Sequence, residues 1–209
     1  MVYQALHALA WLSEAHKSYD DMRPLNIGRG VERSNWKNAS DHNVSGTHSW
    51  MLLDRSGYSY SNAFQVQLDN FVRKDCNLYM SPQLFSGVYK RDRNVHYDAN
   101  KADVFGLGMS ALQAGLGSSV QNCYNRKTGL FDTEALSRHK DEFFNLYGCD
   151  NKLLCDIVNL CLEVDESHRL TAPELLNSEL PAYDMIVGHF QTHSHNKVRF
   201  FLLTVFIGR

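Results

Sequence analysis

The chain of 209 residues is long enough for one domain with a sizeable hydrophobic core, and 44% hydrophobic with 21% charged residues is typical of a globular protein. Because the formal net charge is −2, bulk charge favours neither nucleic acid nor a membrane surface as a partner, and we expect neither. The five cysteines are an odd number without CxxC spacing, which favours free thiols in a cytoplasmic protein over disulfides or zinc.

The first predicted element is an amphipathic helix. Apolar residues recur at helical spacing at Val2, Ala5, Leu6, Leu9 and Leu12. The run has no basic start and is interrupted by polar residues, so it does not have the pattern of a secretory signal. The apolar stretch 200–207 near the other end is too short to span a bilayer.

A polar turn with several ionisable side chains follows this helix, with the sequence YDDMRPLN at 19–26. Taken alone, such a turn is solvated and carries no chemistry. The next stretch, 28–50, is polar and lacks periodicity, which predicts a loop inserted between two short strands. A short apolar strand then ends at Asp54, and 55–78 has exposed hydroxyl groups and is predicted to be a solvated loop.

The stretch 79–117 contains the strongest helix pattern of the chain. Apolar or small residues fall at helical spacing and nearly all round the helix at Val104, Phe105, Leu107, Gly108, Met109, Ala111, Leu112 and Gly115. A helix that is apolar all round is buried, so we expect the other helices to pack around this one. Asp103 stands at its predicted start, where a carboxylate accepts free backbone N–H groups and complements the helix dipole.

The remainder is predicted to be helical, and the fold class is mainly α with few strands (α+β). One helix follows Asp132 and Thr133 and places Phe143 and Phe144 on its apolar face, and a second covers 153–162. The sequence Thr171-Ala172-Pro173-Glu174 is a capping box that opens a last helix to about Leu180. The apolar stretch 198–207 is either a packed strand or helix, or an added tail that exposes an apolar patch.

Two motifs in this order resemble the protein kinase family. Tyr79-Met80-Ser81-Pro82-Gln83, followed by Lys101-Ala102-Asp103-Val104-Phe105-Gly106-Leu107-Gly108, is similar to the Pro-Glu element that closes the activation segment and the Asp-x-x-x-x-Gly opening of the central helix. The stretch 164–176 is similar to the family's closing pattern of an Asp, an Arg, a Thr and a short helix. The resemblance implies a kinase-like large (C-terminal) lobe with a central buried helix at 101–116.

The resemblance also gives the polar turn a role, as the catalytic loop at 18–27. The family reads His-Arg-Asp-x-Lys-Pro-x-Asn there, and Asp21 matches the carboxylate that accepts or orients the substrate hydroxyl proton. Arg23 replaces a lysine that steadies the phosphoryl group, and keeps its charge as a planar fork. Asn26 matches the amide that holds a metal ion. Asp20 replaces an arginine that receives the activation-loop phosphate in many members, and an acid there would repel that phosphate.

The family's second metal ligand corresponds to Asp54, at the start of an activation segment at 54–83. Arg55 and Ser56 replace the family's Phe and Gly, so a strand-ending aspartate that caps a turn is an equally good interpretation of Asp54. Gln83 replaces the glutamate that pairs with the arginine matched by Arg169. Since glutamine can still accept from a guanidinium, we expect a looser segment rather than an unfolded one.

The family's cofactors are ATP and magnesium, and the resemblance implies them here. The glycine-rich loop, the strand lysine and its glutamate partner, which hold ATP in the family, have no counterpart before the catalytic loop. We therefore expect a kinase-like domain at 1–180 without the small lobe, a tail of unknown role at 181–209, and weak or absent ATP binding by this chain.

The first functional hypothesis is thus a Ser/Thr-type protein kinase domain, reduced to its large lobe and inactive as an isolated chain. The alternative is a pseudokinase or interaction scaffold of the same fold. In both cases the partner is a protein, as substrate or as ligand. An unrelated helical protein is the third possibility.

Overall fold

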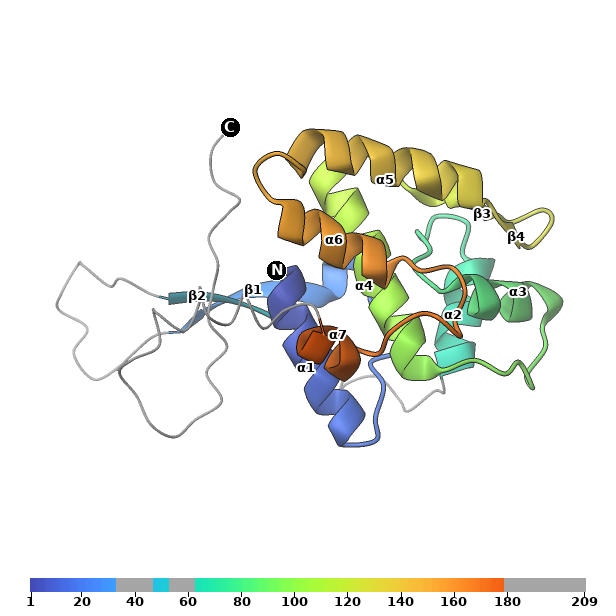
Figure 1. Cartoon of the computed structure of the whole chain (residues 1–209). Coiled ribbons are helices and arrows are strands. Elements are labelled where there is room, and N and C mark those ends of the chain that lie inside the picture. The colour runs from blue at the N-terminus through green and yellow to red at the C-terminus, as the bar shows by residue number, and fades with distance from the viewer. Residues whose placement is uncertain (33–46, 53–62, 179–209) are drawn as a thin grey trace, which may run out of the picture.

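The computed structural model describes residues 1–32, 47–52 and 63–178, and these form a mainly helical fold, as predicted (Figure 1). Its elements are α1 (Val2–Glu14), η1 (Pro24–Asn26), β1 (Ile27–Glu32), β2 (Thr47–Leu52), α2 (Ala63–Val72), α3 (Pro82–Lys90), α4 (Ala99–Leu116), η2 (Gln121–Cys123), β3 (Tyr124–Asn125), β4 (Leu130–Phe131), α5 (Thr133–Tyr147), α6 (Lys152–Cys161) and α7 (Ala172–Ser178). In this part of the chain no helix is both long and apolar enough to cross a membrane.

Helix α4 is the centre of the fold, as its apolar pattern predicted. All ten residues from 103 to 112 are buried, and α1, α5, α6 and α7 all contact this helix. In Figure 1, α4 runs between α5 and α6 on one side and α1 and α7 on the other. The helix begins at Ala99, earlier than the predicted 101, because the Asp98 side chain accepts from the Lys101 N–H at 3.1 Å and caps it.

The strands are fewer and shorter than the helices. Strands β1 and β2 pair antiparallel, with Ile27 opposite Leu52 and Glu32 opposite Thr47, and β3 pairs with β4. The predicted loop at 28–50 was too long at both ends, because its first and last residues belong to this ladder. Gly28 and Gly30, which have low strand propensity, concealed β1 in the sequence.

Two helices were missed in the predicted activation segment and just after it. Helix α2 lies where a solvated loop was expected, and Phe64 and Gln67 are buried there. Helix α3 begins at Pro82, with the Ser81 Oγ accepting from the Leu84 N–H at 3.4 Å. Both are short amphipathic helices, whose few apolar positions give a weak periodic signal.

The helices that follow α4 agree with the prediction except in detail. The Asp132 side chain caps α5, but Phe144, placed on the apolar face with Phe143, is 52% exposed. In the capping box of α7, the Glu174 carboxylate accepts from both the N–H and the hydroxyl of Thr171, each at 2.7 Å. The structure describes α7 as far as Ser178, and the predicted end at Leu180 and the tail at 181–209 lie outside the described residues.

Two glycines let other segments approach α4 closely. A Cβ at Gly106 would lie 2.9 Å from the Tyr79 carbonyl oxygen and 2.9 Å from the Met22 Cβ. A Cβ at Gly108 would lie 2.7 Å from Leu162 Cγ, in the segment that follows α6. These distances are shorter than van der Waals contact, so a side chain at either position requires the neighbour to move.

We predict that Gly106→Ala destabilises the protein by about 1–3 kcal/mol, the usual cost of overpacking. In an open helix the same substitution would stabilise by about 1 kcal/mol through helix propensity, so the expected sign is reversed. The reason is that the Tyr79 contact is with backbone, which cannot rotate away. Urea unfolding measures the change, with Ser137→Ala on the exposed side of α5 as the control that should be neutral or slightly stabilising. A gain in stability from Gly106→Ala would contradict the packing described.

Candidate functional site

The candidate catalytic loop lies between α1 and β1, against the first half of α4 (Figure 1). Its two expected catalytic residues, Asp21 and Arg23, form a bidentate ion pair. Arg23 Nε donates to Asp21 Oδ1 at 2.8 Å, and Arg23 Nη2 donates to Asp21 Oδ2 at 2.7 Å. Asp21 is buried, and the turn places both residues on the same side because the Arg23 N–H also donates to the Asp21 carbonyl at 3.0 Å.

Asn26, the expected metal ligand, closes the same loop. Its amide Nδ2 donates to the Asp21 carbonyl oxygen at 2.9 Å, and the Tyr19 hydroxyl donates to the Asn26 carbonyl at 3.3 Å. The structure therefore brings Asp21, Arg23 and Asn26 together, and their catalytic and metal-binding roles stay predictions. Asp54, the other predicted metal ligand, lies outside the described residues.

The loop is held on α4 by the carboxylate of Asp103. This side chain accepts from the backbone N–H of Tyr19 at 2.6 Å and from that of Asp20 at 2.8 Å. The prediction that Asp103 caps its own helix is wrong, since Asp98 does so and Asp103 lies in the second turn. Asp103 is buried, as expected, but its side chain accepts hydrogen bonds from N–H groups more than eighty positions earlier in the chain.

Burial raises the pKa of Asp103 to about 8, against an ordinary value of 3.8. The backbone N–H of Tyr19 lowers the pKa in part, and the neighbouring Asp20 and Asp21 carboxylates raise it. Burial also raises the pKa of Tyr97 to about 12, assisted by the negative charges of Asp20, Asp103 and Glu166.

Asp20 has an unusual backbone conformation. Its φ is +70°, in the left-handed region that non-glycine residues seldom adopt. Its N–H is held by Asp103, and its carbonyl oxygen accepts from Gln67 Nε2 of α2 at 2.6 Å. Helices α4 and α2 thus hold this strained residue from two sides.

Three of these loop contacts could not be found from sequence. Gln67 is one, and Ser110 is another, since its hydroxyl donates to the Met22 carbonyl at 3.1 Å from within α4. The third is the hydrogen bond that the Tyr19 N–H donates to Asp103. A polar residue at one position of a helix, or a backbone group in a turn, gives no signal of its distant partner.

A second long-range cluster surrounds Arg169, which is 1% exposed. Its guanidinium donates to the carbonyls of Glu163 at 2.6 Å and Val164 at 3.1 Å, and to Gln83 Oε1 at 3.3 Å, and it lies 4.8 Å from the Phe105 ring centroid. Gln83 Nε2 also donates to the Val164 carbonyl at 2.8 Å. The predicted Gln83–Arg169 contact is therefore present.

A third set of contacts fixes the end of the predicted activation segment. The Gln121 side chain accepts from the Leu78 N–H at 2.6 Å and donates to its carbonyl at 2.9 Å, and the Tyr124 hydroxyl donates to the Met80 carbonyl at 2.9 Å. The Arg126 guanidinium donates to carbonyls of 71–76, among them those of Phe71 and Cys76. The side chains of Gln121, Tyr124 and Arg126, which make these contacts, were not singled out in the sequence.

Comparison with models of known protein families, and with curated proteins, gives no match for this sequence. The kinase resemblance therefore remains a prediction that rests on the motifs and on where their residues lie. Among the described residues, no group of three or more His, Cys, Asp or Glu side chains is arranged to hold a metal ion. Of the two predicted metal ligands, only Asn26 is described.

We predict that Asp103→Asn destabilises the protein by about 1–3 kcal/mol near pH 5, where the raised pKa keeps the folded-state carboxyl protonated. Each oxygen of the protonated carboxyl still has a lone pair for an N–H group, whereas the amide nitrogen of asparagine can only donate. The Asp103 pKa is 3.8 when unfolded and about 8 when folded, so the folded state binds this proton more tightly. The stability this contributes is complete below pH 3.8 and is lost as the pH rises through about 8.

The advantage of the parent over Asp103→Asn should accordingly shrink as the pH rises from about 5 to about 8, measured by urea unfolding. Ser110→Ala removes another anchor of the same loop but no titratable group. Its effect should stay constant with pH. A parent advantage that stays constant between about pH 5 and pH 8 would mean that Asp103 is ionised in the folded state across this range, and would contradict the raised pKa.

We predict that Gln83→Glu stabilises the protein by about 1 kcal/mol at neutral pH. A hydrogen bond to a charged partner contributes about 1.5–3 kcal/mol, which outweighs the loss of the bond that Gln83 Nε2 donates to the Val164 carbonyl, about 0.5–1.5 kcal/mol. Arg169 is already buried among carbonyl oxygens, and a carboxylate would give it an ion pair. The pair lowers the pKa of the new carboxyl in the folded state, so the gain is present above about pH 4.3 and is lost in acid. Urea unfolding at neutral and acidic pH measures it. Gln83→Leu, which removes the acceptor, should instead destabilise, and an unstable Gln83→Glu would refute the electrostatic account.

Proposed function

We propose that this chain carries a protein kinase-like large lobe, and that the 209-residue polypeptide by itself does not transfer phosphate. The observation that supports this best is the contact from the Asp103 carboxylate to the N–H groups of Tyr19 and Asp20. It joins the two segments that the kinase motifs marked independently, the catalytic loop and the opening of the central helix. The Gln83–Arg169 contact joins two other such segments, the end of the activation segment and the closing motif.

The roles proposed for the loop follow from the chemistry of its residues. Asp21 has the carboxylate that a substrate hydroxyl needs as proton acceptor, and Arg23 has the positive charge that phosphoryl groups require. In the arrangement described, however, these two groups satisfy each other through two hydrogen bonds. The bidentate, charge-assisted pair is a strong geometry for arginine and carboxylate. A substrate hydroxyl would have to displace Arg23 from this pair to reach Asp21.

The family's cofactors find few partners in the described residues. The Asn26 side-chain amide donates a hydrogen bond from Nδ2 to the Asp21 carbonyl. Its Oδ1 is then the one side-chain oxygen that Asn26 could offer a metal ion. One amide oxygen does not make a magnesium site, which takes six oxygens, usually with carboxylates and phosphates among them. We therefore derive no step of the reaction through magnesium or ATP.

The alternative function is an interaction scaffold of the same fold, a pseudokinase. The closed Asp21–Arg23 pair favours it, because a site closed on itself needs no nucleotide to be stable. Asp20 favours it too, since an acid at the position where many family members have the arginine that receives the activation-loop phosphate would repel that phosphate.

The direct test is transfer of labelled phosphate from Mg-ATP to a generic protein substrate by the 209-residue polypeptide and by its Asp21→Asn variant. We expect no transfer by either, because removing one preorganised electrostatic partner already costs about a hundredfold or more in rate. Transfer by the parent and not by the variant would overturn the inactivity while strengthening the kinase-like assignment. Transfer by both would remove Asp21 from the mechanism.

Thermal unfolding with and without Mg-ATP gives an independent readout. A ligand at a hundred times its dissociation constant stabilises the folded state by about 2.7 kcal/mol, which is easily detected in a melt. We expect no shift, and a clear upward shift would show that the polypeptide binds the nucleotide.

A further inference from the structure

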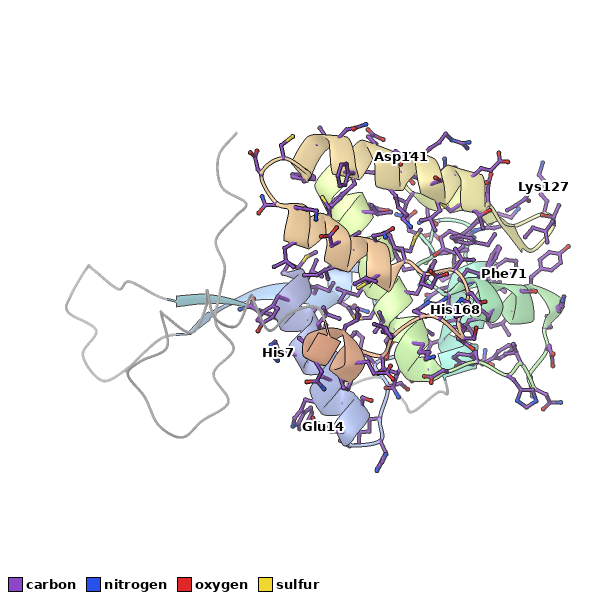
Figure 2. All side chains as sticks on the ribbon, in the orientation of Figure 1. His7, Glu14, Phe71, Lys127, Asp141 and His168 are labelled. Carbon is purple, nitrogen blue, oxygen red and sulfur yellow. The ribbon has the colours of Figure 1, made fainter. Side chains whose placement is uncertain are left out.

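An exposed apolar patch lies where the end of α2, the end of α3 and the β3–β4 hairpin meet. We call it the Tyr89 face, and its apolar members are Val72, Tyr89 and Leu130, which are 61%, 36% and 68% exposed. In Figure 1 these elements gather at the side of the molecule opposite β1 and β2. Figure 2 shows Phe71 of α2 and Lys127 of the hairpin on this side, away from His7 and Glu14 of α1.

Specific contacts hold the three segments together at this face. The Tyr89 hydroxyl donates to the Lys127 carbonyl at 2.8 Å, and the Tyr89 ring lies 6.3 Å from the Phe71 ring, next to Val72. The ring also lies against Gly129, next to Leu130, where a Cβ has no room and φ is +70°. Arg126 joins the hairpin to α2 through the carbonyls of Phe71 and Arg73, at 3.0 and 3.1 Å. The three apolar side chains are therefore carried on one fixed framework.

The charge around the Tyr89 face differs from that of the whole chain. Six exposed cationic side chains lie in the segments that carry it, Arg73, Lys74, Lys90, Arg91, Arg93 and Lys127. In the same segments, 72–75, 89–93 and 127–130, the acids are Asp75 and Asp92, so the local net charge is +4, against −2 for the chain. Only one of the cations has an ion pair among the described residues, Arg73 with Asp75 at 3.7 Å.

We propose that the Tyr89 face is a docking site for an acidic protein segment that carries apolar side chains. The cations supply attraction and orientation for carboxylates. The three apolar residues offer a surface that a segment can bury only with apolar side chains of its own, so a purely acidic segment would leave them exposed. A nucleic acid backbone would need only the cations, so the combination favours a peptide.

This inference goes beyond the proposed function, because the face uses none of the residues 19–26. A kinase-like lobe and an unrelated helical protein could both present it. Its test therefore succeeds or fails separately from the phosphate-transfer assay.

The test is fluorescence anisotropy of the 209-residue chain with a labelled peptide of alternating glutamate and leucine. A matched peptide with serine for leucine has the same charge. We expect a dissociation constant on the order of 10–100 μM for the first peptide, typical of a small transient contact, and at least tenfold weaker binding of the second. Binding should also weaken as salt is raised, because exposed charges are screened.

Two double variants address the two components of the face. Lys90→Glu with Lys127→Glu, and Val72→Ser with Leu130→Ser, should each weaken binding of the first peptide about tenfold or more. The controls make comparable changes outside the Tyr89 face. Lys17→Glu with Arg138→Glu changes the net charge by the same amount, and Phe144→Ser removes another exposed apolar side chain. These controls should bind the peptide as the parent does, and circular dichroism melts establish that all variants are folded.

Equal binding of the two peptides, or a charge control as damaging as the variant of the face, would overturn the proposal. A single-stranded RNA oligonucleotide and anionic vesicles serve as competing ligands. Tighter binding of either one that is insensitive to Val72→Ser with Leu130→Ser would assign the cations to a polyanion and likewise overturn it. No binding of the glutamate–leucine peptide at about 1 mM would do the same.

Discussion

The candidate site depends on the two hydrogen bonds that the side chain of Asp103 accepts. This side chain lies in the second turn of the buried helix α4 and accepts the N–H groups of Tyr19 and Asp20. Without an acceptor, two backbone donors would be left without partners beside a buried helix, each at a cost of about 1–3 kcal/mol. The same contact positions the loop, since the turn that joins Asp21, Arg23 and Asn26 starts at the residues that Asp103 holds.

The surroundings of Asp103 explain why the loop takes a strained shape. Asp20 has φ of +70°, and such a conformation persists only where neighbours hold it. Asp103 holds the Asp20 N–H and Gln67 holds its carbonyl, so α4 and α2 fix one residue from both sides. Gly106 lets the loop and the Tyr79 backbone approach α4 at the distance that these bonds require. The conformation of the loop is therefore a consequence of helix packing.

Arg169 provides a second centre of the same kind, also against the first half of α4, where its guanidinium lies 4.8 Å from the Phe105 ring centroid. A buried guanidinium is costly unless its donors are satisfied, and here backbone carbonyls and the Gln83 amide oxygen accept them. This arrangement accounts for a glutamine at position 83, because carbonyl oxygens already supply most of the acceptors. It also shows how a family motif can change one residue while the contact between its segments is kept.

The sequence by itself determined the buried helix α4, the helices α1, α5, α6 and α7, and the grouping of Asp21, Arg23 and Asn26, because periodicity, capping residues and short separations are local properties. Its failures were long-range or weakly periodic: the role of Asp103, the partners Gln67 and Ser110, the short helices α2 and α3, and the exposure of Phe144. Only the tertiary structure decided these, since a hydrogen bond between residues distant in the chain leaves no local pattern. A carboxylate near a helix start has the same local sequence whether it caps that helix or holds another loop, and packing chooses between the two.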